Sequence, residues 1–200
     1  DLLFNLMGEV SDMPYLGSRR AEIVRLLGVE PGERLFARVL REPRHSISLA
    51  SDDPLLMLAA RERSSGHWLM AAGPHTEEVQ RGTACSHVLA NVLKAILPLL
   101  ALKEREVAVV DSTAGMDMVG SGISVGMDLC YVVCEPTIHS TKTAKQIAEG
   151  LGWFGVPYRF ILNKVQHEDQ KKQAEEWLGA PPLYTLAFAA DEAVNASVFE

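Results

Sequence analysis

The sequence has few cysteines, no excess of basic residues and no long uninterrupted apolar run. Each of these shortages argues against one class of protein. Its 19 lysine and arginine residues against 26 aspartate and glutamate residues give a net charge of −7, which argues against a nucleic-acid surface. The longest apolar stretch, residues 88–102, is interrupted by Lys94 and Pro98 and does not reach the roughly 18 apolar residues that cross a bilayer. Three irregularly placed cysteines do not indicate a disulfide framework. We therefore expect a cytoplasmic protein that binds neither nucleic acid nor membrane.

What the chain does contain is a series of short apolar runs with helical patterns between them. Strands are expected at 67–72, 106–111, 129–135, 158–163 and 183–188. Three of these runs are apolar nearly throughout, which is typical of parallel strands covered on both faces. Helices are expected from Ser86 to about Leu102, from Ser140 to a stop at Gly155, and over 167–179 with Gly179 at the close. The alternation predicts a single α/β domain over residues 1–200, with a doubly wound, mainly parallel sheet flanked by helices.

Polar residues stand at the carboxyl ends of three expected strands, where ligands bind in such sheets. They are Asp111, Glu135 and Asn163. Asp111 has two interpretations: it ends its strand and caps the next segment, or its carboxylate lies near the Mg²⁺ of a bound nucleotide. Gly115, four residues on, fits the second interpretation, because a glycine lets a backbone N–H approach a terminal phosphate without an intervening side chain. The stretch by itself does not decide between the two interpretations.

The segment FILNKV, residues 160–165, carries the second signal. The amide of Asn163, with Lys164 beside it, offers both a donor and an acceptor and can read the edge of a base. The alternative is a polar strand end followed by a turn. The order of the two elements, an acidic strand end, then a strand with its crossover helix, then LNK, is more specific than either alone. It predicts the back half of a P-loop nucleotide-binding domain.

Residues 107–165, with VVDSTAG, VVCEPTIHSTKTAKQIAE and ILNKV, resemble the MinD/ParA/nitrogenase iron-protein group of P-loop ATPases. Within that group the chain looks most like the CooC accessory proteins, which assist nickel insertion into carbon monoxide dehydrogenase. The likeness extends from residue 66 to about 198. It implies ATP and Mg²⁺ as cofactors, Asp111 as the switch aspartate and Gly115 as the switch glycine. It also implies that Asn163, with Lys164 beside it, recognises the base.

The resemblance is less regular at both ends of the chain. Asp1, in DLLFNLMG, matches the end of the family's DxDP-x-x-N-L element, and Asp191 stands where the family has a late loop near the adenine. A phosphate-binding loop needs a glycine-rich turn with a lysine and a Ser/Thr, and nothing in the sequence supplies it. Two explanations stay open: the chain is an N-terminally incomplete ATPase that lacks the first strand–P-loop–helix unit, or it has lost nucleotide binding. In either case we expect no efficient ATP hydrolysis by the chain as given.

Cys85 and His87 are the candidate metal ligands. CooC-like proteins have a Cys-x-Cys pair at this place, which implies four thiolates around one metal in a dimer, whereas this sequence has Thr83 in place of the first cysteine. His87 can complete a Cys/His set for Ni²⁺ or Zn²⁺. The alternative is a small residue at a helix start and a solvated neighbour. Cys130 and Cys134 lie roughly 13 Å apart on a strand, too far to share a metal, and are expected in the core.

Three functions are open on this basis. The first is a homodimeric MinD/CooC-type ATPase that couples ATP-dependent dimerisation to nickel insertion into a client metalloenzyme such as carbon monoxide dehydrogenase. The second is a nucleotide-independent metal-binding or adaptor module on the same fold. The third is a ParA/MinD-like positioning ATPase, against which the acidic charge and the absence of a basic amphipathic tail both argue.

Overall fold

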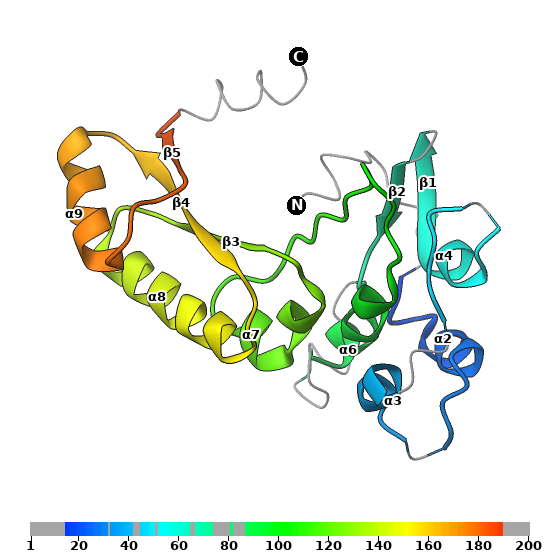
Figure 1. Cartoon of the computed structure of the whole chain (residues 1–200). Coiled ribbons are helices and arrows are strands. Elements are labelled where there is room, and N and C mark those ends of the chain that lie inside the picture. The colour runs from blue at the N-terminus through cyan, green and yellow to red at the C-terminus, as the bar shows by residue number, and fades with distance from the viewer. Residues whose placement is uncertain are drawn as a thin grey trace. The chain divides into compact units, whose positions relative to one another are not determined.

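The computed structural model describes residues 15–31, 33–41, 45–50, 52–64, 67–73, 81 and 87–189 (Figure 1). These residues form a mixed α/β structure, as predicted, and the chain divides into two compact units. The first unit extends to Ser112 and takes in Ser121–Gly126, whereas the second comprises Thr113–Gly120 and the chain from Met127 onward. The expectation of a single domain stays a prediction, and each unit is described by itself.

The first unit is mainly helical in the part that the structure describes. Its helices and 3₁₀ turns are α2 (Arg20–Leu26), α3 (Leu35–Arg41), α4 (Pro54–Ala59), α6 (His87–Ile96), η1 (Leu97–Leu99) and η2 (Ile123–Gly126). The helix predicted between Ser86 and Leu102 is confirmed over α6, which passes into η1 at Pro98 because proline lacks an N–H for the helical ladder. None of the described helices of the chain is long and apolar enough to span a bilayer.

A hairpin and an apolar core complete the first unit. Strands β1 (Ala60–Ser64) and β2 (His67–Met70) pair antiparallel, with Ala60 opposite Met70. The strand predicted at 67–72 is therefore confirmed over its first four residues, but its partner is a neighbouring hairpin strand. Completely buried aliphatic side chains form the core; among them are Leu16 from the turn before α2 and, from the helices, Ile23, Leu56, Val92 and Ile96.

The second unit contains the parallel sheet (Figure 1). Its strands β3 (Cys130–Cys134), β4 (Tyr158–Val165) and β5 (Tyr184–Ala187) are parallel neighbours in that order. Its helices are α7 (Asp117–Ser121), α8 (Ile138–Trp153) and α9 (Glu168–Leu178). Helix α8 connects β3 to β4, and α9 connects β4 to β5. The predicted strands at 129–135, 158–163 and 183–188 and the two helices between them are confirmed, with boundaries shifted by one to three residues.

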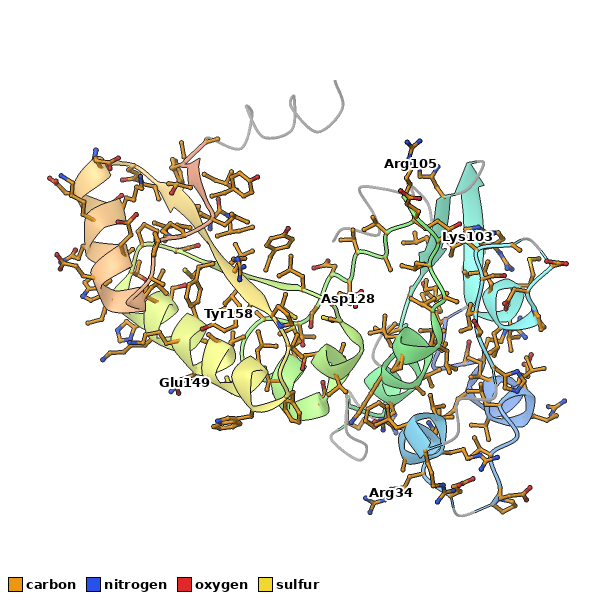
Figure 2. All side chains as sticks on the ribbon, in the orientation of Figure 1. Arg34, Lys103, Arg105, Asp128, Glu149 and Tyr158 are labelled. Carbon is orange, nitrogen blue, oxygen red and sulfur yellow. The ribbon has the colours of Figure 1, made fainter. Side chains whose placement is uncertain are left out.

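One face of this sheet is buried by α8 and α9. In β3 the side chains alternate, so Cys130, Val132 and Cys134 are buried while Tyr131 and Val133 on the other face are exposed. The buried side chains join residues of α8 and α9 in one core cluster. Burial raises the pKa of the Cys134 thiol to about 11. The prediction that both strand cysteines belong to the core is confirmed. On the outer side of α8, Glu149 is directed away from the sheet (Figure 2).

The helix ends show why α8 and α9 begin and stop where they do. Helix α8 is capped by Thr137, whose Oγ1 accepts a hydrogen bond from the Ser140 N–H at 3.3 Å. The expectation that Ser140 is the cap was wrong by three residues, since Ser140 lies in the first turn. Helix α9 ends at Gly179, whose φ of +75° is the left-handed conformation that glycine adopts without strain. This end was predicted correctly.

Residues 106–111 differ most from the prediction. Within the described part of the chain they form neither helix nor strand, and the side chain of Val109 is 84% exposed. An apolar run becomes a strand only when a neighbouring strand pairs with its N–H and C=O groups. No described strand pairs with this segment. Asp111 therefore ends a largely exposed segment without regular secondary structure, and its predicted position at the end of a buried strand was wrong.

Candidate functional site

The carboxyl ends of three parallel strands bring together residues that are distant in sequence. Glu135 follows the last residue of β3, Asn163 and Lys164 lie just before the end of β4, and Phe188 follows the last residue of β5. Because the strands are parallel neighbours, these residues lie along one edge of the sheet. That edge is where open α/β sheets bind their ligands.

A β-bulge shapes the middle of this edge. Leu162 pairs with Thr185 but Val165 pairs with Ala187, so β4 has one residue more than β5 over this stretch. The additional length is taken up at Asn163 and Lys164, and Lys164 has a left-handed backbone with φ of +60°. A non-glycine residue in this conformation costs about 1–2 kcal/mol, so the surrounding structure holds it there. Bulges of this kind re-aim side chains next to binding sites.

The bulge fixes the amide of Asn163. The backbone N–H of Lys164 donates to Asn163 Oδ1 at 2.9 Å. This bond occupies one acceptor position of the oxygen and orients the whole planar amide, whose NH₂ group can donate two further hydrogen bonds. An amide held in one orientation on a rigid strand end is suited to reading the donor and acceptor edge of a heterocyclic base. The structure thus holds the amide of Asn163 in one orientation near the carboxyl end of β4, and its role in base recognition stays a prediction.

Glu135 is joined to the same edge by an ion pair. Its Oε1 lies 2.6 Å from the Nζ of Lys164, 29 residues away in sequence. The backbone N–H of Glu135 donates to Ser140 Oγ at 2.9 Å. These two contacts connect the first turn of α8 to the bulge that carries Asn163. The Glu135 and Lys164 side chains are 47% and 55% exposed, so the pair orders the edge and contributes little to stability.

Asp111 and Gly115 lie on the segment that passes from the first unit to the second. Asp111 belongs to the first unit and its side chain is exposed, whereas Gly115 belongs to the second. Gly115 has φ of +83°, and no atom lies within 4 Å of the position that a Cβ would occupy. The positive φ is a conformation that glycine adopts without strain, and the role of Gly115 as a switch glycine stays a prediction. The relation between Asp111 and the Asn163 edge stays a prediction, because the two residues belong to different units.

For the remaining candidate residues, the structure describes little or nothing of the side chain. Asp1, Cys85 and Asp191 fall outside the described residues, and His87 is the first residue of α6. Among the residues that the structure describes, no three His, Cys, Asp or Glu side chains are grouped as metal ligands. The metal role of Cys85 and His87 therefore stays a prediction, as do the roles of Asp1 and Asp191.

Polar groups able to form directional hydrogen bonds gather at the carboxyl edge of the second unit's sheet. The amide of Asn163 accepts a hydrogen bond from the Lys164 N–H, and the ammonium of Lys164 pairs with Glu135. Ser112, which follows Asp111 in the sequence, has a buried Oγ with no hydrogen-bond partner among the described residues, which is unusual for a hydroxyl. The sequence contains no glycine-rich loop with a lysine for the phosphate end of a nucleotide.

Two features of this edge escaped sequence reasoning. Glu135 was recognised as a strand end without a role, because its partner Lys164 is 29 residues away and only the fold brings the two together. Phe188 was not predicted as a site residue. The sequence does show an aromatic residue at the end of the strand predicted at 183–188, and that signal could have identified it. Its side chain is 53% exposed, and its backbone N–H donates to the Val165 carbonyl oxygen at 2.9 Å.

Comparison with known proteins supports a nucleotide-binding relationship. No protein-family model matches the chain. An uncharacterized ATP-binding protein of Methanocaldococcus jannaschii is 34% identical over 87 residues, which are 44% of this chain and 35% of that protein. A second uncharacterized ATP-binding protein of the same organism is 33% identical over 122 residues, 59% of this chain and 47% of that protein. The chain thus matches less than half the length of each of these ATP-binding relatives.

Proposed function

We propose that this chain is the base-recognising part of a MinD/CooC-type ATPase, which couples ATP-dependent dimerisation to nickel insertion into a client metalloenzyme such as carbon monoxide dehydrogenase. The observation that carries the nucleotide part is the fixed amide of Asn163 at the carboxyl edge of a parallel sheet. The similarity to two ATP-binding proteins supports the same ligand. The dimer, the nickel and the client enzyme rest on the resemblance of residues 107–165 to CooC proteins.

In this proposal Asn163, Gly115 and Asp111 each contact a different part of the bound nucleotide or its Mg²⁺. Asn163 donates to and accepts from the base, while Lys164 and Glu135 keep its amide in place. Gly115 offers a backbone N–H to the terminal phosphate, and the carboxylate of Asp111 orients the hydration shell of Mg²⁺. Loss of the terminal phosphate then releases the segment that contains Gly115, which is how phosphate-held switches move.

The test is a titration of the chain with MgATP, followed by NMR because binding without a phosphate loop is expected to be weak, with a dissociation constant of about 1 mM, equivalent to about 4 kcal/mol. Asn163→Ala is expected to weaken binding about tenfold or more, since the directional hydrogen bonds to the base are lost. Gln166→Ala is the matched control, because Gln166 is an exposed amide residue three positions further along the same edge. Equal binding by wild type and Asn163→Ala would contradict base recognition.

A second candidate is a nucleotide-independent metal-binding module, favoured by the missing phosphate loop and by Cys85. Its signature is tight binding of Ni²⁺ or Zn²⁺, measured by calorimetry, that Cys85→Ser abolishes while MgATP has no effect. Cys130→Ser is the control, because that thiol is buried in the second unit. Metal binding that is equal in wild type and Cys85→Ser would dismiss this candidate.

A further inference from the structure

Phe188 is an exposed aromatic residue on an edge whose other members are polar. It follows directly after β5, and its side chain is 53% exposed. The hydrogen bond from its backbone N–H to the Val165 carbonyl oxygen, 2.9 Å long, continues the parallel pairing of β5 with β4. The sheet therefore holds the backbone of Phe188 in a defined place, and its ring is about half exposed there.

The same pairing puts Phe188 at the carboxyl end of the strand that neighbours the one carrying Asn163. Ala187 is opposite Val165, and Asn163 lies two residues before Val165 on the bulged stretch of β4. A planar amide and an aromatic ring at neighbouring strand ends are the two kinds of group that recognise a base. The amide reads the edge of the base by hydrogen bonds, and the ring stacks on its flat face.

We propose that Phe188 stacks on the base of the nucleotide whose edge Asn163 reads, so that these two residues together form a purine-binding site. This inference rests on the proposed nucleotide-binding function and adds a residue to it. Burial in the core does not explain an aromatic side chain at this position, because the side chain is half exposed, whereas stacking on a base does. It also explains how a chain without a phosphate loop can hold a nucleotide, because the base end supplies both directional and apolar contacts.

The two contacts predict different selectivity. Every base has a flat π face, so stacking on Phe188 is expected to favour adenine and guanine nucleotides alike. Hydrogen bonds from a fixed amide depend on the pattern of donors and acceptors, so Asn163 is expected to set the preference between them. Loss of the ring should lower both affinities, whereas loss of the amide should change their ratio.

Tyr184 provides a matched control on the same strand. It is an aromatic residue at the amino end of β5, opposite Ile161, and its side chain is 62% exposed. It has the same kind of ring and similar exposure at the other end of the strand from Phe188. If the exposed rings of β5 serve only as an apolar surface, replacing either one should have the same effect on nucleotide binding.

The experiment titrates the chain with MgATP and MgGTP and compares wild type, Phe188→Ala, Phe188→Leu, Phe188→Trp and Tyr184→Ala. Phe188→Ala is expected to weaken both nucleotides about tenfold, as base–aromatic stacking predicts. Phe188→Trp should retain binding, and Tyr184→Ala should bind like wild type. Phe188→Leu keeps the apolar volume, so it answers the question if the alanine variant does not fold.

NMR of the bound nucleotide gives an independent reading. An aromatic ring stacked on a base shifts the base protons upfield, and this shift should be present with wild type and Phe188→Trp and lost with Phe188→Leu. If wild type binds MgATP but Phe188→Ala and Tyr184→Ala bind it equally well, the stacking role is overturned while the proposed function stands. If wild type binds no nucleotide at millimolar concentration, the proposed function fails, and the stacking role fails with it.

Discussion

A single methyl group added at Gly150 tests how the segment that carries Gly115 is held in the second unit. Gly150 lies on the buried side of α8, and a Cβ built there would stand 2.7 Å from Cγ1 of Val119 in α7. Val119 is itself buried in the core of the second unit and, as a β-branched residue, moves aside with difficulty. Gly152, two residues further along the same helix, has no atom within 4 Å of its Cβ position.

The two glycines should therefore respond to alanine with opposite sign. In a helix, Gly→Ala stabilises by roughly 0.5–1 kcal/mol when space allows. Gly152→Ala should show this gain. At Gly150 the same gain is opposed by an overpacking cost of about 1–3 kcal/mol, because the contact is shorter than real Cβ contacts allow. We expect Gly150→Ala to lower the free energy of unfolding by about 1 kcal/mol, so that the two variants differ by about 1–3 kcal/mol.

Urea unfolding followed by circular dichroism measures this difference, and a double-mutant cycle assigns it. In a Val119→Ala background the obstructing methyl groups are gone, so Gly150→Ala should become neutral or stabilising there. The reasoning would be refuted if Gly150→Ala stabilised as much as Gly152→Ala in the wild-type background. In that case α7 would not pack on α8, and the segment that carries Gly115 would not be anchored to the second unit.

Three further predictions concern the exposed segment, the buried thiol and the ion pair. Val109→Lys should change the free energy of unfolding by no more than about 0.5 kcal/mol, since the side chain is 84% exposed, whereas Val132→Lys in buried β3 should prevent folding or lower stability severely; a severe loss at Val109 would mean that the segment is buried. Because the pKa of Cys134 is raised to about 11 from 9.0, the unfolded state loses this proton first, so stability should fall between about pH 9 and about pH 11, and Cys134→Ala should reduce that fall in urea titrations. Glu135→Gln should cost less than about 1 kcal/mol of stability at low salt and nothing at high salt, and a larger, salt-independent loss would contradict a half-exposed pair.

The second unit could be predicted from sequence because its signals are local. The runs that became β3, β4 and β5 are apolar and short, and they are separated by helices with recognisable ends. Gly155 and Gly179 indicate those ends in the sequence, because a helix commonly ends at a glycine in the left-handed conformation. Both glycines adopt positive φ in the structure. The Ser140 cap was misplaced since Thr137 and Ser140 are both good caps three residues apart, and sequence does not say which hydroxyl reaches the free N–H groups.

The features that sequence could not give depend on contacts between distant residues. The run at 106–111 has the composition of a buried strand. A strand also needs a neighbouring strand to pair with, and the sequence of the run does not predict which strand that is. Likewise, nothing about a lysine predicts the left-handed conformation of Lys164. That conformation results from the bulge between β4 and β5, and the bulge in turn positions Asn163. The type of residue at the site was predictable, while its geometry was not.

A map of amide chemical-shift changes on addition of MgATP tests the central claim most directly. We predict that the backbone amides of Glu135, Asn163, Lys164 and Phe188 shift in a saturable way, because they lie at the carboxyl edge that binds the base. The amides of Val156 and Tyr158, at the amino end of β4, should not move (Figure 2). No saturable change at the carboxyl edge, or equal changes at both ends of the sheet, would contradict a nucleotide site at this edge.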